Sequence, residues 1–166
     1  MKVSDLQHQE LFTAQADESL DVAADRMNWH QVGALPVLEG QHLVGIITER
    51  DVTAAMAEGA DAATTPLSDY MTPAPEVLQP DSELADATHL MLELGIRHLP
   101  IVRGGCLVGV LSMRDLLDAE IHHADGWPLA RPPHRDQRDL VEAAHWRAVA
   151  GPVRARRAVA DLPRPL

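Results

Sequence analysis

The sequence predicts an α+β fold of two β-α-β-β-α repeats related by an approximate two-fold axis, followed by a C-terminal extension. The first observation is a duplication, because residues 3–52 align with residues 67–116 at a constant offset of 64 without a gap. The second observation is that an amphipathic helix, two apolar runs and another helix follow one another in the same order in both copies. One such unit buries its apolar face poorly alone, so we expect the copies to pack together and form paired clefts.

Identical residues at matching positions carry the duplication. Pairs separated by 64 positions include Ser4/Ser68, Asp5/Asp69, Asp17/Asp81, Met27/Met91, Leu35/Leu99, Pro36/Pro100, Gly45/Gly109, Arg50/Arg114 and Asp51/Asp115. So many identities in one register indicate a tandem repeat. We assign residues 1–58 to the first repeat, residues 59–119 to the second and residues 120–166 to the C-terminal extension.

Each repeat is expected to contain two helices and a β-hairpin. Asp17, and Asp81 in the second copy, precede apolar residues spaced three and four apart, so both acids are candidate N-caps of an amphipathic helix. Two apolar runs joined by a Gly-containing turn then predict a hairpin, and a helix follows from Thr48 or Ser112. The proline that both first strands share, Pro36 in the first copy, favours an edge or strand-entry position.

The remaining segments connect or extend these units. Residues 11–14 and 76–78 are the extended pieces that would complete each β-α-β-β-α unit. Residues 57–65 are small and polar, as a linker between copies should be. In the extension, residues 136–150 could form one helix with a thin apolar stripe.

Composition and charge exclude several classes of function. Residues 1–119 carry six basic and nineteen acidic residues, a net charge of −13, which would repel a phosphate backbone, so we expect no nucleic-acid partner. The chain has no apolar signal segment at its start and no stretch long enough to span a bilayer, so we expect a cytoplasmic protein without a membrane partner. Cys106 is the sole cysteine, which excludes an internal disulfide, and we expect a packed thiol.

Both copies end their last strand with one motif: a glycine, two aliphatic residues, a hydroxyl residue, any residue, then Arg-Asp. It reads GIITERD at residues 45–51 and GVLSMRD at residues 109–115. One interpretation is a capping box, in which hydroxyl and carboxylate only bind the backbone at the helix start. The other is a nucleotide site, because such a carboxylate can accept from two ribose hydroxyls while the helix N-terminus favours a phosphate. A strand glycine often marks close approach of a ligand or of another backbone.

These motifs, with LSDYMTP at residues 67–73 and GIRHLPIV at residues 95–102, resemble a tandem pair of CBS domains, the Bateman module. The resemblance covers about residues 1–119 and not the extension. It implies a body of two three-stranded sheets with helices, which commonly dimerises into a flat disc. It also implies adenosine-containing ligands, with no required cofactor: AMP, ADP, ATP, S-adenosylmethionine, NAD(H) or a cyclic dinucleotide.

Two equivalent ligand sites follow from the resemblance. It gives Thr48 and Asp51 the roles of hydroxyl and ribose-binding acid in one site, and Ser112 and Asp115 those roles in the other. Arg97 stands where relatives often place a phosphate-binding basic residue. The expected ligand-binding residues are therefore Gly45, Thr48, Asp51, Arg97, Gly109, Ser112 and Asp115.

The two sites are expected to differ. The counterpart of Arg97 in the first copy is Gly33, and the counterpart of Met-Thr-Pro at residues 71–73 is Gln-His-Gln. The cleft that Arg97 serves should therefore suit a charged phosphate better, although the sequence leaves open which acid shares that cleft. Arg97 is equally well read as a surface arginine paired with a nearby acid. His98 is more simply a hydrogen-bonded strand histidine than a ligand contact.

Other kinds of site have weaker support. The histidines of the C-terminal part lack the ligand spacing of a structural zinc site, so we expect no metal: His122, His123, His134 and His145. No nucleophile, base and orienting group can be assembled, so an enzyme is not expected and no residue is assigned a catalytic role. Trp29 ends an amphipathic helix and is interpreted as a core or dimer contact.

These observations favour a regulatory module that senses an adenine nucleotide or related adenosyl ligand without catalysis, and we expect this module to form a homodimer. The extension is a candidate for contacting a protein partner. The alternative is a protein-interaction and dimerisation scaffold whose clefts are empty.

Overall fold

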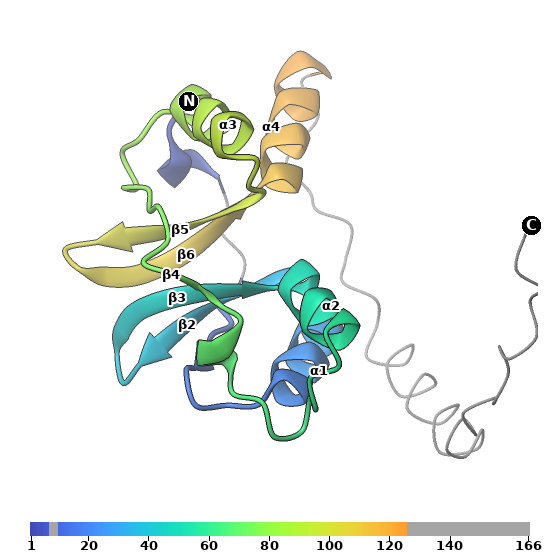
Figure 1. Cartoon of the computed structure of the whole chain (residues 1–166). Helices are drawn as coiled ribbons and strands as arrows, with labels where there is room; N and C mark the ends of the chain where they lie inside the picture. The colour runs from blue at the N-terminus through green and yellow to red at the C-terminus, as the bar shows by residue number, and fades with distance from the viewer. Residues whose placement is uncertain (7–9, 126–166) are drawn as a thin grey trace, which may run out of the picture. The chain divides into compact units, whose positions relative to one another are not determined.

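The computed structural model describes residues 1–6 and 10–125, and it confirms the α+β class and the two repeats (Figure 1). The expected helix at residues 136–150 lies outside the described residues. The first repeat contains η1 (Val3–Asp5, a 3-10 turn), β1 (Ala14–Gln15), α1 (Leu20–His30), β2 (Ala34–Glu39), β3 (His42–Thr48) and α2 (Glu49–Ala57). The second contains η2 (Leu67–Asp69), β4 (Thr72–Pro73), α3 (Leu84–Leu94), β5 (His98–Arg103), β6 (Cys106–Ser112) and α4 (Met113–Asp125).

The sheet pairing repeats with the offset seen in the sequence. Leu35 lies opposite Ile47 in the β2–β3 hairpin, as Leu99 lies opposite Leu111 in the β5–β6 hairpin. The outer pairing also repeats, since β1 pairs in parallel with β2, and a single bridge at Leu78 pairs in parallel with β5. The expected extended segment of the second copy is therefore present, reduced to one bridging residue. The expectation of two three-stranded sheets is wrong, because among the described residues one sheet has the four strands β1-β2-β3-β4 and the other has only β5 and β6.

The shared proline does not mark an edge strand in the first copy, although β5 of the second copy belongs to a two-stranded sheet. Pro36 is buried in β2, which lies between β1 and β3 in the strand order β1-β2-β3-β4. In the second copy the carbonyl of Pro100 accepts from Leu78 N at 2.8 Å, and Val102 N donates to Leu78 O at 2.8 Å. Leu78 bonds to the carbonyl of Pro100 and to the N–H of Val102, and neither bond needs an N–H at residue 100. The N–H that proline lacks therefore leaves no gap in the pairing. A strand-entry position thus tolerates the proline inside the sheet.

The expected N-caps Asp17 and Asp81 are wrong. Helix α1 begins at Leu20 after Ser19, and neither Ser19 nor Glu83, the residue before α3, caps its helix with a side-chain hydrogen bond. Backbone carbonyls accept the hydrogen bonds from the first N–H groups of these helices instead. Leu20 N donates to the carbonyl of Thr65 at 3.0 Å, and the equivalent N–H at the start of α3 bonds the carbonyl of Met1 at 2.9 Å. The residue 57–65 linker therefore caps a helix of the first repeat.

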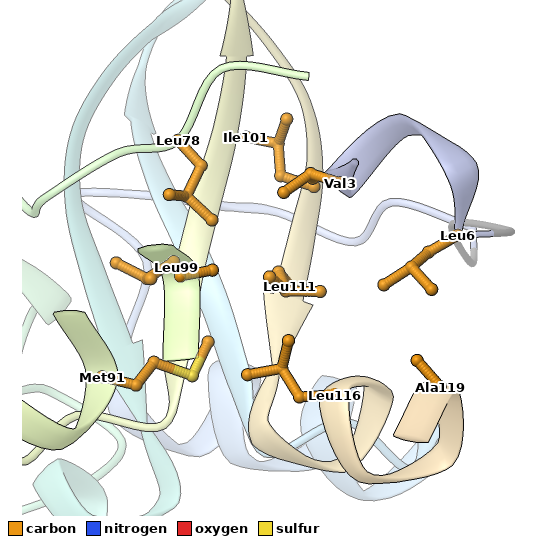
Figure 2. Packing of buried hydrophobic residues seen from close by; sticks show 10 residues of the cluster. Val3, Leu6, Leu78, Met91, Leu99, Ile101, Leu111, Leu116 and Ala119 are labelled. Carbon is orange, nitrogen blue, oxygen red and sulfur yellow. The ribbon is translucent and has the colours of Figure 1, made fainter. Parts of the chain in front are cut away.

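The hydrophobic core of each repeat includes residues from the beginning of the other repeat. Val3 and Leu6 lie in the core of the second repeat, and Leu67 lies in the core of the first. Figure 2 shows Val3 and Leu6 facing a cluster formed by Leu78, Met91, Leu99, Ile101, Leu111, Leu116 and Ala119. Because the exchange is reciprocal, neither repeat completes its core alone.

The structure contradicts the expectation for Cys106 and one of the two alternatives for Trp29. Cys106 is exposed rather than packed, because it follows the Gly104–Gly105 turn at the tip of the β5–β6 hairpin. Trp29 is 56% exposed, so it is not a core residue, and its interpretation as a dimer contact stays a prediction. It lies two positions after buried Met27, about 200° round the helix, and so on the opposite face of α1. Within the described residues, no helix has the length and apolar character needed to cross a membrane.

Candidate ligand-binding cleft

The start of α2 carries the first of the two predicted motifs as a complete capping box. Asp51 Oδ2 accepts from Thr48 N at 2.8 Å and from Thr48 Oγ1 at 2.7 Å, and Asp51 N donates to Thr48 Oγ1 at 3.3 Å. The capping interpretation is therefore correct, but it does not exclude a second role for the carboxylate. It occupies only one carboxylate oxygen, since Asp51 Oδ1 accepts no hydrogen bond from the residues that the structure describes.

The second motif has the same geometry at the start of α4. Asp115 Oδ2 accepts from Ser112 N at 2.8 Å and from Ser112 Oγ at 2.6 Å, and Asp115 N donates to Ser112 Oγ at 3.3 Å. The two caps agree within 0.1 Å in every bond. The cap hydrogen bonds therefore do not distinguish the motifs, and a functional difference must come from their other contacts.

The first motif faces a cleft of about 310 Å³ that both repeats line. The first repeat supplies Ile46, Thr48, Arg50 and Asp51, and the second supplies Thr72, Ala74, Pro75, Glu76, Leu94, Gly95, Ile96, Arg97 and His98. This answers the question that the sequence left open, because Asp51, and not Asp115, shares a cleft with Arg97. A volume of this size lies at the lower end of the range for small-molecule sites, about 300–1,000 Å³.

The motif glycine Gly45 does not line this cleft. A Cβ at Gly45 would overlap the Met71 side chain and lie 3.0 Å from the carbonyl oxygen of Thr72. Its lack of a side chain is therefore required by β4, which pairs with β3 at this point. Gly109 is buried at the equivalent place in β6, opposite Ile101 in β5. Gly45 therefore permits close packing of β4, and direct contact of either glycine with a ligand stays a prediction.

Two arginines in the cleft have no acidic partner among residues 1–6 and 10–125. Arg97 and Arg50 are both exposed, and neither forms an ion pair within this part of the chain. In contrast, Arg26 contacts both carboxylate oxygens of Glu18, at 2.7 and 2.9 Å. The description of Arg97 as a surface arginine paired with a nearby acid therefore does not hold here. Both guanidinium groups remain available to an anionic ligand.

His98 begins β5 as expected of a strand histidine, but its ring makes no hydrogen bond to the described residues and lines the cleft instead. Burial, and secondarily the positive charge of Arg97, lower the pKa of His98 below 6.5, although Asp115 opposes the shift. The ring lies close to the first repeat, because a Cβ at Gly33 would be 3.4 Å from His98 Nε2 and 3.5 Å from Glu49 Oε2. A neutral imidazole therefore forms part of the wall between the repeats.

Sequence reasoning missed the segment that crosses the cleft between the two sheets. Strand β4 pairs with β3 of the first repeat, and Leu78 pairs with β5 of the second. Between them, Ala74, Pro75 and Glu76 line the cleft. Ala74 has a positive φ of 44°, unusual for a residue other than glycine, and its N–H donates to Val44 O at 3.0 Å. The two closely spaced prolines of residues 71–76 (MTPAPE) could have been used to predict a rigid connecting segment here.

Two β-α-β-β-α repeats, with a helix N-terminus that opens on a cleft between them, place this chain in the class of duplicated α+β modules. The sequence profile of the CBS domain matches twice, at residues 3–58 and 67–122, and the chain therefore belongs to the CBS domain family. It is 36% identical over 115 residues to the CBS domain-containing protein YhcV of Bacillus subtilis, covering 69% of this chain and 81% of that protein.

Solved structures share the fold. The structure of CBSX2 in complex with AMP has a TM-score of 0.65 and 27% identity, covering 74% of this chain and 98% of that one. The CBS domain protein PAE2072 of Pyrobaculum aerophilum, complexed with AMP, has a TM-score of 0.64 and 25% identity, covering 69% of this chain and 89% of that one.

Proposed function

We propose that this protein is a regulatory module that binds an adenine nucleotide or related adenosyl ligand between its CBS repeats and does not change it chemically. One observation carries the proposal: the cleft joins the Thr48–Asp51 helix start of one repeat to unpaired Arg97 of the other. The AMP complexes of CBSX2 and PAE2072 support the ligand class.

The lining residues suit the parts of a nucleotide. Asp51 Oδ1 can accept hydrogen bonds from ribose hydroxyls while Oδ2 continues to cap α2. The guanidinium groups of Arg97 and Arg50, together with the positive end of the α2 dipole, favour a phosphate. Apolar side chains suit a base, among them Ile46 and Ile96. No cofactor is needed for binding of this kind.

A second site in this proposal uses Ser112 and Asp115, with Gly109 beneath them. It rests on the matching cap geometry at the start of α4. Because Gly33 replaces the arginine there, we expect that site to bind phosphate less strongly than the cleft of Arg97.

Ligand binding would regulate by bridging the repeats. The segment from β4 to Leu78 is hydrogen-bonded to β3 on one side and to β5 on the other, and its middle lines the cleft. A ligand that contacts both repeats favours the relative arrangement it binds best, by an amount set by its difference in affinity. We propose that the C-terminal extension passes this change to a protein partner.

We also propose that the module forms a homodimer through helices. Large apolar side chains are exposed on α1, α3 and α4: Trp29 at 56%, Leu92 at 70% and Leu117 at 57%. Analytical ultracentrifugation would show a dimer, and a Leu92→Arg substitution should shift it toward monomer. The same exposed side chains favour the alternative function, a dimerisation scaffold with empty clefts.

A thermal-shift screen separates the two functions, with calorimetry to follow on ligand-stripped protein. The screen would use AMP, ADP, ATP, S-adenosylmethionine, NADH and cyclic di-AMP. A ligand that binds only the folded protein raises its stability, by about 2.7 kcal/mol at a concentration of 100 Kd. A stabilising adenosyl compound whose effect is lost in Arg97→Gln supports the sensor. No shift with any compound, and an unchanged dimer, would support the scaffold.

A further inference from the structure

The cleft of Arg97 contains a second carboxylate whose role the ribose and phosphate contacts do not explain. Glu76 lies on its lining, in the segment between β4 and Leu78, and is exposed. It makes no ion pair or side-chain hydrogen bond with the residues that the structure describes. Arg97 and Arg50 line the same cleft and are equally unpaired, so Glu76 neither neutralises an arginine nor closes the site.

Glu76 is also specific to this half of the duplication. Its counterpart 64 positions earlier is Phe12, and the counterpart of Arg97 is Gly33. Phe12 stacks on His30, with ring centroids 3.6 Å apart and planes 18° apart, and the counterpart of His30 is Leu94 of the cleft lining. The acid and the arginine are therefore present together in one copy and absent together from the other.

The charges that line the cleft balance. Arg50 and Arg97 contribute two positive charges, Asp51 and Glu76 contribute two negative charges, and His98 is held neutral by its surroundings. The charge of Asp51 is already stabilised by Thr48 and by the N-terminus of α2. The charge of Glu76 has no such compensation and acts directly on whatever enters.

The surroundings make each further negative charge on a ligand unfavourable. Residues 1–119 carry a net charge of −13, so the field outside the cleft also opposes anions. One phosphate group, with a charge of about −1.5 to −2 at pH 7, matches the two arginines. A triphosphate brings about two more negative charges, which no further basic residue of the lining can neutralise.

We propose that Glu76 is a specificity-determining residue that restricts the cleft to nucleosides with a single phosphate and discriminates against triphosphates. This rests on the proposed function, since it concerns the ligand of the same cleft. Glu76 acts by repulsion: it lowers the affinity for all anionic nucleotides, and lowers it most for the most highly charged one.

The test compares AMP and ATP by titration calorimetry in metal-free, low-salt buffer. The proteins are ligand-stripped wild type, Glu76→Gln and the matched control Glu39→Gln. Glu39 is exposed at the tip of the β2–β3 hairpin, whereas Thr48 lies at its base, so the control removes the same charge away from the cleft.

Wild type should bind AMP more tightly than ATP. In Glu76→Gln the affinity for ATP should rise about three- to tenfold more than the affinity for AMP, and 0.5 M salt should reduce the difference. Glu39→Gln should keep the wild-type ratio.

An unchanged ratio in Glu76→Gln, with AMP still bound, would overturn the role of Glu76 and leave the proposed function intact. An equal gain in Glu39→Gln would also overturn it, because overall charge would then explain the effect. Binding of neither nucleotide to any of the proteins would overturn the proposed function and this inference together.

Discussion

Substituting Asp51 by Asn separates the two roles that the structure gives to one carboxylate. Thr48 N needs an acceptor, which is now Asp51 Oδ2 at 2.8 Å. In the variant the amide oxygen would take this place, because the amide nitrogen cannot accept. The amide NH₂ would then replace Oδ1 in the cleft. The helix cap survives, and the acceptor proposed for ribose becomes a donor.

The two effects have different expected sizes. Loss of a charge-assisted hydrogen bond to a ribose hydroxyl should cost about 1.5–3 kcal/mol of binding, which is about 10- to 150-fold in Kd. The folded protein should lose only the interaction of the carboxylate with the α2 dipole, about 0.3–1 kcal/mol of unfolding free energy. Asp115→Asn provides a comparison for stability at pH 7.5, because its cap agrees with that of Asp51 within 0.1 Å and His98, on which Asp115 also acts, is neutral there.

The assays are titration calorimetry with AMP and urea denaturation followed by circular dichroism. The reasoning predicts that both Asn variants lose similar stability, and that Asp51→Asn greatly weakens binding in the cleft of Arg97. An affinity for AMP within twofold of wild type, in an Asp51→Asn protein whose stability has fallen as expected, would refute it. The carboxylate would then be a helix cap and nothing more.

Three further predictions concern the scaffold around the cleft. Ala74→Gly should raise the unfolding free energy by up to about 1 kcal/mol, because φ is 44° there, and a destabilised variant in urea would contradict the strain. Leu67→Ala should cost about 2–5 kcal/mol, since Leu67 is fully buried in the core of the other repeat, and a cost under about 1 kcal/mol would contradict that placement. His98 has a pKa below 6.5 in the folded protein, so the unfolded chain binds a proton at His98 more readily. The unfolding free energy should therefore be highest above about pH 6.5 and fall below it. In His98→Gln the dependence of the unfolding free energy on pH should be weaker between pH 7 and 5.

The fold could be predicted from the sequence because its repeating features are local. Periodic apolar positions, turn glycines and the hydroxyl-x-x-Asp caps each depend on neighbouring residues, and α2 begins after Thr48 as expected. The caps of α1 and α3 could not be predicted in this way. Their donors bond to carbonyls of Thr65 and Met1, which come from distant parts of the sequence. Asp17 satisfied the local rule, but α1 begins only at Leu20, whose N–H bonds to the carbonyl of Thr65.

The candidate site was predictable in part for the same reason. Thr48 and Asp51 were found because one motif contains both. Glu76 and Ala74 were missed, because nothing local connects them with a helix start in the other repeat. The pairing of Asp51 with Arg97 depends on how the repeats pack, and a sequence offset contains no information on which acid faces which arginine.

The duplication itself shows which positions are structural and which are open to functional change. Identical pairs such as Pro36/Pro100 and Gly45/Gly109 are buried in the sheets, where any change would disturb packing that both repeats share. Two of the differences lie on the lining of the described cleft, where Arg97 and Glu76 correspond to Gly33 and Phe12 in the alignment. A fold kept constant while its lining diverges is expected when two equivalent positions come to recognise different ligands. The two motifs, which share the same cap hydrogen bonds, should therefore differ in ligand preference.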